Sequence, residues 1–484
     1  MPITQAPAIA WRAIGPALAL SGGAVVTLMA GAIYRRINRG VLAGMTLATI
    51  GAASYLTFIL AGKKIVGMQG MVAVDGVSTF TTMILLFTVT IVTLMSYSYL
   101  SERHIHRFEY YPLLLLATAG MVLLASANDL ILVFISLEVL SLALYVLVGL
   151  ARRDAGAQEA SLKYFLLGAF SSAILLYGIA LAFGATGTTN IAKIAGLSGA
   201  PSTDSRLMFA AAALLAVGFA FKIAVVPFHS WTPDVYQGAP TSVTGFMAAG
   251  TKAAGFAVLL RVFLVALGPL QWDWRPALWL IAIVTMVVGS LLAIVQSDVK
   301  RLLAYSSIAH AGFVLVGVIA ATANGIAGSL FYLLVYAAMT LGAFAVVTLS
   351  APKGKERLEM ASWVGVGQRH PVFAGAMTLF LLSLAGIPPT AGFMAKFFVF
   401  QAAVQAGETG LVIAGVLASV IAAFFYLRLI VLMWLQDPTG EPGVLGLTPT
   451  GSLVVAITAG ATLVLGVYPE AIMHIARTAA FFTG

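Results

Sequence analysis

The chain contains no cysteine and little charge. None of its 484 residues is cysteine, and Asp, Glu, Lys and Arg together make up 9% of them. Without thiols the chain cannot form disulfides, thiolate-bound iron–sulfur clusters or cysteine zinc sites, so any redox centre must lie in another chain. Ordinary soluble domains are about 25% charged. The polar residues are therefore too few to cover a water-soluble protein of this size.

Hydrophobic residues account for 61% of the chain. Apolar runs of about 20 residues are long enough to cross a bilayer, and the sequence has about fourteen of them. We predict an all-α polytopic membrane protein, with residues 1–484 forming a single membrane domain. The first run lacks the basic start of a cleavable signal, so we expect it to be retained. The predicted spans are 16–34, 41–61, 77–100, 111–127, 129–150, 161–184, 208–228, 240–267, 277–295, 302–320, 326–350, 372–402, 410–435 and 450–468.

Basic residues in the loops predict the orientation. Five follow even-numbered spans, namely Lys63, Lys64, Lys193, Arg206 and Arg275. Thirteen follow odd-numbered spans, namely Arg35, Arg36, Arg39, Arg103, Arg107, Arg152, Arg153, Lys300, Arg301, Lys353, Lys355, Arg357 and Arg369. Because lysine and arginine collect on the cytoplasmic side, we expect a multi-pass protein of the cell membrane with both termini on the outer, periplasmic side. The net charge of +9 is then a topology signal and requires no nucleic-acid partner.

Ionisable residues also occur inside the predicted spans. They are Glu138, Lys222, Lys252, His310, Lys396 and Arg428. Such residues are expensive in a membrane and are functional by default. Each also has a structural interpretation: a lysine can neutralise a carboxylate for assembly, a histidine can be a hydrogen-bonded packing residue, and an arginine can cap backbone carbonyls. Four cations with one acid cannot all be paired internally, so neutralisation does not explain the whole set.

Prolines interrupt two of these spans. Pro227 lies in the seventh, five residues after Lys222, and Pro388-Pro389 lies in the twelfth, shortly before Lys396. Proline removes a helical hydrogen bond, so we expect breaks whose freed carbonyls face polar side chains or water. The breaks are five spans apart, which predicts two repeats of inverted topology, spans 4–8 (residues 111–267) and spans 9–13 (residues 277–435).

These features together predict proton transfer. A buried lysine has its charged form desolvated and can gain and lose a proton near neutral pH. A carboxylate close to such a lysine favours the charged state, and moving it away favours release. We expect Glu138 to lie within direct or one-water reach of Lys222 or Lys163.

Four stretches carry a family resemblance. They are SLKYFLLGAFSSAILLYGIALAFGATGT (161–188), FKIAVVPFHSWTPDVYQGAPTSVTGFMAAGTKAAGFAVLLR (221–261), DVKRLLAYSSIAHAGF (298–313) and AGIPPTAGFMAKFFVF (385–400). The chain resembles the antiporter-like subunit N of bacterial NADH:quinone oxidoreductase, respiratory complex I, and its mitochondrial and chloroplast counterparts. The resemblance spans roughly residues 75–435.

The resemblance implies specific roles. The family's buried glutamate falls on Glu138, its lysines fall on Lys222, Lys252 and Lys396, and His310 matches a polar position. It implies proton translocation driven by electron transfer from NADH to quinone, with no cofactor in this chain, because flavin, iron–sulfur clusters and quinone belong to partner subunits. The implied partners are the lipid bilayer, an M-type antiporter-like subunit, small K-type neighbours and the lateral helix of the L-type subunit. M-type chains carry glutamate where Lys396 stands, so GFMAKF favours subunit N.

Two other functions are compatible with these residues. The D-type subunit of a multisubunit sodium/proton antiporter shares the lysines and the GxPPxxGF break, although PFHSWTPDVYQGAP favours complex I. A passive assembly scaffold is the other alternative, and the charges in the middle of the spans argue against it.

Overall fold

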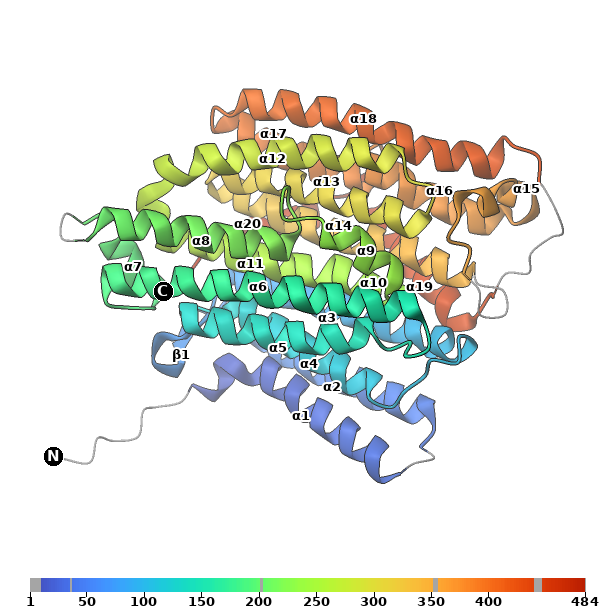
Figure 1. Cartoon of the computed structure of the whole chain (residues 1–484), viewed down its shortest axis with the longest axis horizontal. Helices are drawn as coiled ribbons and strands as arrows, with labels where there is room; N and C mark the ends of the chain where they lie inside the picture. Colours follow the sequence, from blue (N-terminus) through green and yellow to red (C-terminus); the bar gives the residue numbers. More distant parts are fainter. Residues whose placement is uncertain (1–9, 35–36, 201–202, 351–355, 439–445, 484) are drawn as a thin grey trace.

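The computed structural model describes residues 10–34, 37–200, 203–350, 356–438 and 446–483. Long helices lie side by side along one direction, and their connections gather at two ends of the bundle (Figure 1). The two basic positions 35–36 and the lysines at 353 and 355 lie outside the described residues. The arrangement confirms the predicted all-α membrane class.

Twelve helices of the described chain are long and apolar enough to cross a membrane. They are α1 (Trp11–Ile33), α2 (Arg39–Leu60), α3 (Gly76–Glu102), α5 (Leu130–Val148), α6 (Ala155–Thr186), α8 (Ser205–Ile223), the composite helix Thr241–Ala266, the helix Gly268–Ile294 that contains α12 (Gln271–Ile294), α13 (Val299–Ala320), α14 (Ala323–Leu349), α18 (Thr409–Trp434) and α19 (Pro449–Val467).

The remaining α-helices are shorter. They are α4 (Tyr110–Ser126), α7 (Ile191–Leu197), α9 (Trp231–Gly238), α15 (Val366–Arg369), α16 (Pro371–Ala385), α17 (Ala391–Gln405) and α20 (Glu470–Ala479). Twelve long helices are fewer than the predicted fourteen because α4 has 17 residues and the run 372–402 is divided between α16 and α17. A hairpin of β1 (Ile65–Gly67) and β2 (Val72–Val74), paired through Ile65↔Val74, connects α2 to α3.

Aspartates begin five of the long helices. The side chains of Asp75, Asp129, Asp154, Asp204 and Asp298 accept hydrogen bonds from backbone N–H groups in the first turns of α3, α5, α6, α8 and α13. Such caps satisfy donors that a helix leaves unpaired and place negative charge at the positive end of the helix dipole. A substantial part of the 17 carboxylates thus fixes where the spans begin.

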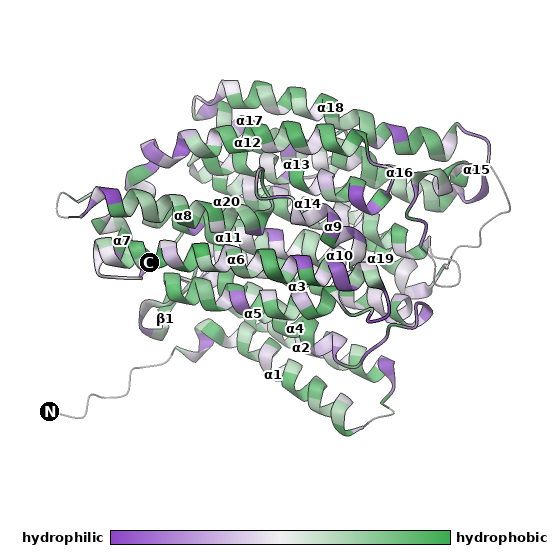
Figure 2. Cartoon of the chain, viewed as in Figure 1, coloured by the Kyte–Doolittle hydropathy of each residue, from purple (hydrophilic) through white to green (hydrophobic). Residues whose placement is uncertain are grey.

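The core lies around α13, α14 and the helix 241–266. In the apolar windows of these helices 94%, 94% and 89% of the residues are buried, against about a third for α1, α2 and α18. Hydrophobic residues follow the bodies of the helices and hydrophilic residues collect near the two ends (Figure 2). Large apolar side chains such as Phe170 on α6 and Val420 on α18 are exposed, which suits a surface in contact with lipid.

The two halves of the twelfth predicted span meet at a glycine. A Cβ atom at Gly392, the second residue of α17, would lie 1.7 Å from the carbonyl oxygen of Ser383 in α16. No side chain fits there without moving the backbone. Gly392 therefore sets how closely α16 and α17 approach.

We predict that Gly392→Ala lowers the amount of the chain in membranes and the Tm of the purified complex. Gly375→Ala is the matched control, because it lies inside α16 and a Cβ there meets no atom within 4 Å. Replacing glycine by alanine in a helix interior stabilises by about 0.5–1 kcal/mol, so the control is expected to accumulate at the parental level or above. Equal yields and Tm values for both variants would contradict the close approach.

Candidate functional site

The seventh predicted span ends earlier than its hydropathy indicates. Helix α8 stops at Ile223, and Ala224 adopts a left-handed conformation with φ of 60°. The N–H of Val225 donates to the carbonyl of Ala220, and the N–H of Ala224 donates to those of Ala220 and Phe221. These bonds form a Schellman-type helix end, which the sequence predicted only as an interruption near Pro227.

The twelfth span breaks with the same geometry. Helix α16 stops at Ala385, and Gly386 is left-handed with φ of 85°. Its N–H donates to the carbonyls of Leu382 and Ser383, and the N–H of Ile387 donates to Leu382. The left-handed residue precedes Pro389 by three positions, as Ala224 precedes Pro227.

Side chains satisfy backbone groups that the breaks release. The indole Nε1 of Trp231 donates to the carbonyl of Phe221 (3.1 Å), and the N–H of Val226 donates to Oγ1 of Thr285 (3.0 Å). At the second break Nζ of Lys396 donates to the carbonyl of Ala385 (2.9 Å). Buried peptide groups need such partners where bulk water is excluded.

Lys222 is buried beside the first break, with its side chain directed toward α5. Its Nζ donates to Oγ of Ser141 (2.9 Å) and lies 5.8 Å from the ring centroid of Tyr164. A cavity of about 10 Å³ lies against it, lined in part by Ser171 and Tyr145. That volume and its polar lining fit about one water molecule.

Glu138 does not pair directly with a lysine. It lies on α5 one turn before Ser141, and no ion pair among the described residues includes it. Its Oε1 has no hydrogen-bond partner in the described part of the chain. Lys163 instead binds Glu159 and Asp234, both at 2.7 Å. The structure thus shows no direct pair of Glu138 with either lysine, because Lys163 binds two other carboxylates and Lys222 reaches Ser141. The one-water contact of Glu138 stays a prediction.

Lys252 is the first residue of α11 (Lys252–Arg261) and follows a π-helical turn, η2 (Met247–Thr251). Its Nζ donates to the carbonyl of Ser307 and lies 5.5 Å from the ring centroid of Tyr336. Single π-helical turns are rare and recur at functional sites.

His310 and Lys396 lie farther along the same interior. Nδ1 of His310 is 2.7 Å from the hydroxyl of Tyr332, and Nε2 is 3.3 Å from that of Tyr426. Nζ of Lys396 lies 4.5 Å from the ring centroid of Phe313. Both residues are buried.

Shared neighbours connect these groups into a row. A Cβ at Gly255, one turn from Lys252, would lie 3.9 Å from Cγ of Lys222. The ring of Tyr336 contacts both Lys252 and His310, whose ring centroid lies 5.2 Å from it. The ring of Phe313 lies 5.9 Å from that of His310 and also faces Lys396. The structure thus brings four of the five predicted proton-transfer residues into one buried row, with Glu138 beside its first member.

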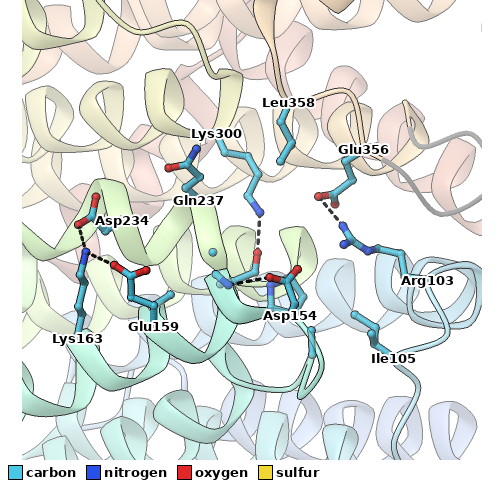
Figure 3. Close-up of a pocket in the computed structure, with 16 residues that line it drawn as sticks. Arg103, Ile105, Asp154, Glu159, Lys163, Asp234, Gln237, Lys300, Glu356 and Leu358 are labelled. Carbon is cyan, nitrogen blue, oxygen red and sulfur yellow. Dashed lines mark hydrogen bonds and ion pairs between the residues drawn. The ribbon is translucent and has the colours of Figure 1, made fainter.

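A polar cavity opens at the end of the bundle that carries most of the basic loops (Figure 3). It measures about 360 Å³, and Lys163, Asp234 and Glu159 form a linked cluster in it. Nζ of Lys300 points to the carbonyl of Ala239 (2.6 Å) on its floor. The other lining residues include Arg103, Asp154, Gln237, Glu356 and Leu358.

Glu356 closes one side of this cavity. Its carboxylate binds Arg103 at 2.7 Å and is almost fully buried. Burial by itself would raise the pKa of Glu356, but Lys300 and Arg103 outweigh burial and hold this pKa below its usual range. The carboxylate therefore stays ionised and keeps Glu356 attached to Arg103, the residue that follows α3.

Sequence reasoning missed or misplaced several basic residues. Lys300 and Arg103 were counted only as loop charges, and Arg261 was overlooked although it lies inside the predicted span 240–267. Arg428 was assigned to the middle of a span, but it lies six residues before the end of α18, is exposed, and donates to the carbonyl of Ile294 (2.8 Å). The described residues contain no group of three His, Asp or Glu that could hold a metal ion.

Comparisons with known proteins point to one family. The family model described as NADH:quinone oxidoreductase/Mrp antiporter, TM, matches residues 127–422. The NADH-quinone oxidoreductase subunit N of Parafrankia sp. is 43% identical over 508 aligned residues, which cover 98% of this chain and 95% of that protein.

Solved structures show the same likeness. A chain of respiratory complex I from Thermus thermophilus with bound aureothin is 35% identical, with a TM-score of 0.80 over 95% of this chain and 98% of that one. A chain of the Mrp complex from Dietzia sp. has a TM-score of 0.84 over 97% of both chains but is 24% identical, which shows the fold alone. By its identity to curated relatives over nearly its whole length, this chain belongs to the family of subunit N of NADH-quinone oxidoreductase.

Proposed function

We propose that this chain is the proton-translocating membrane-arm subunit of an NADH:quinone oxidoreductase. Its membership of the subunit N family supports this function, and the buried row of Lys222, Lys252, His310 and Lys396 carries it. As a subunit of that translocase it couples quinone reduction elsewhere in the complex to proton transfer through its own side chains. The chain itself supplies protonatable groups and no redox centre.

The hydrogen bonds of the three lysines suit transient protonation. Each ammonium donates to a neutral oxygen, from Ser141 Oγ, the Ser307 carbonyl or the Ala385 carbonyl. A neutral acceptor stabilises a buried cation less than a carboxylate does, so small displacements change how firmly the proton is held. Glu138, near the first lysine but not bonded to it, supplies a negative charge whose movement biases that balance.

The polar cavity supplies an uptake site for this row. Lys163 lines the cavity, and the adjacent Tyr164 faces Lys222. Lys300 lines the cavity, and Ser307 follows it by seven residues on α13, a distance of about 10 Å along the helix. The carbonyl of Ser307 accepts the hydrogen bond of Lys252. Because this end carries most of the loop Lys and Arg, we assign it to the cytoplasm and both termini to the outer side.

We also propose that residues 111–267 and 277–435 are inverted repeats. The support is that α8 and α16 end in the same hydrogen-bond pattern, with a left-handed residue three positions before a proline. Each break has a buried lysine at hand, Lys222 or Lys396. Such paired breaks are how transporters build sites at the middle of the membrane.

The proposed partners are the other membrane subunits of the complex. They are an M-type antiporter-like subunit, small K-type subunits and the lateral helix of an L-type subunit, while flavin, iron–sulfur clusters and quinone lie in partner chains. A D-type sodium/proton antiporter subunit is the competing assignment, and the 24% identity to the Mrp complex chain supports it only at the level of the fold. Co-purification of flavin and iron–sulfur subunits with this chain would exclude it.

We predict that Lys222→Ala leaves the complex assembled but lowers proton pumping in inverted membrane vesicles by about twofold or more. Lys222→Arg is expected to be defective as well, because a guanidinium does not release its proton. Lys193→Ala, an exposed lysine on α7, is the control. Parental pumping by the arginine variant would rule out proton exchange at Lys222.

We predict that Ser141→Ala weakens pumping without reducing assembly. The change removes the acceptor of the Lys222 hydrogen bond, and hydrogen bonds to charged groups contribute about 1.5–3 kcal/mol. Ser136→Ala, on the same helix with a hydroxyl that has no partner in the described residues, is the control. Both variants are measured as protons pumped per quinone reduced, and identical values would show that this bond has no part in transfer.

We predict that Gln237→Cys in the cavity reacts with a membrane-impermeant thiol reagent in inverted vesicles and not in intact cells. The parent chain has no cysteine, so any thiol label on the gel band of this chain comes from the introduced cysteine. Asp273→Cys, at the opposite end of the bundle, is expected to react from outside. The reverse pattern would overturn the orientation, and failure of Gln237→Cys to react from either side would remove the cavity as an uptake site.

A further inference from the structure

Helix α11, which carries Lys252, is bounded by wide turns at both ends. The π-helical turn η2 (Met247–Thr251) precedes it and a second, η3 (Val262–Ala266), follows it. Its first residue is Lys252 and its last is Arg261, and both are buried. π-helical turns interrupt the regular hydrogen-bond ladder, so α11 is a short segment whose orientation the flanking helix fixes less firmly.

Arg261 is held by a buried ion pair. Its guanidinium donates to Oδ2 of Asp75 at 2.8 Å, and the two side chains are 1% and 0% exposed. Asp75 also caps α3 by accepting from the N–H of Ser78 (2.9 Å). The guanidinium lies 3.5 Å from the carbonyl of Ala125 at the end of α4.

The end of the chain covers this pair. The N–H of Thr483 donates to Oδ2 of Asp75 (3.1 Å), and the ring centroid of Phe482 lies 5.1 Å from the guanidinium carbon of Arg261. Gly76 lies directly against the backbone of Ala479. The pair is therefore shielded from water and has a fixed set of neighbours.

Lys252 and Arg261 attach opposite faces of α11 to different helices. Nine residues at about 100° each amount to two and a half turns, which places the two side chains half a turn apart. Lys252 binds Ser307 on α13, whereas Arg261 binds Asp75 at the start of α3. Of these two cations, Arg261 has the carboxylate partner, and its guanidinium stays protonated.

Stability alone does not account for such a pair. A buried ion pair can often be replaced by apolar residues of similar volume with no loss of stability, whereas its geometry is directional. A fixed contact at one end of α11 determines the rotation of the segment about its axis. That rotation decides where the ammonium at the other end points.

We propose that Arg261 is a positioning residue: paired with Asp75, it sets the rotation of α11 and directs the Lys252 ammonium to the Ser307 carbonyl. The inference rests on the proposed function, because it concerns proton transfer through Lys252. Neither Asp75 nor Arg261 exchanges the transferred proton.

The test is the double variant Asp75→Asn/Arg261→Met in the assembled complex. Asparagine keeps the cap of α3, methionine replaces the unbranched part of the arginine side chain, and no unpaired charge is left. The expected result is normal assembly and quinone reduction with protons pumped per quinone lowered about twofold or more, since small misplacements of a reacting group are costly. Arg477→Met, which breaks the exposed pair with Glu470, is the control and is expected to pump like the parent.

Parental pumping by the assembled double variant would overturn the inference, because a purely structural pair is dispensable once both charges are removed. If the double variant does not accumulate, Asp75→Asn alone is measured: reduced pumping with full quinone reduction supports positioning, and parental pumping refutes it. Lys252→Met serves as the reference. If that variant pumps normally, the proposed function fails and the inference with it, whereas normal pumping by the double variant alone overturns only the positioning role.

Discussion

The exclusion of water from the bundle interior is the constraint on which this structure depends. An ammonium or a peptide group that leaves water must find its partners within the protein. The chain meets this need in two ways. At the polar end, Lys163, Arg301 and Arg103 bind carboxylates, whereas Lys222, Lys252 and Lys396 in the interior bind a hydroxyl or backbone carbonyls. Lysines held by neutral oxygens are the cations suited to lose a proton, because a guanidinium stays protonated.

The helix breaks follow from the same constraint and help to build the site. Ending α16 at Ala385 frees a carbonyl, and that carbonyl is the acceptor of Lys396. At the other break Trp231 donates a second hydrogen bond to the carbonyl of Phe221, and Lys222 is left to bond with Ser141 on α5. Two breaks with the same hydrogen-bond pattern thus hold their lysines differently. Lys396 caps the break at the end of α16, whereas Lys222 connects the break at the end of α8 to α5, the helix that carries Glu138.

Much of this arrangement could be predicted from the sequence, and the rest depended on rotation about helix axes. Hydropathy located the spans, Pro227 and Pro388-Pro389 marked the breaks, and the intramembrane charges identified Lys222, Lys252 and Lys396. Spacing along a helix does not say which neighbour a side chain meets across the bundle. Spacing therefore could not show that Lys163 binds Glu159 and Asp234 at the surface cavity and forms no direct pair with Glu138.

The choice of hydrogen-bond acceptor also decides between a scaffold and a proton path. A cation kept only to neutralise charge during assembly would be expected opposite a carboxylate, as Arg103 is opposite Glu356. Lys222, Lys252 and Lys396 have no carboxylate partner among the described residues, yet each is buried. A burial so weakly compensated is costly for a passive structural part. The burial of these lysines without a carboxylate is explained if each ammonium is charged only part of the time. Each lysine then needs an acceptor that tolerates both its protonated and its neutral form.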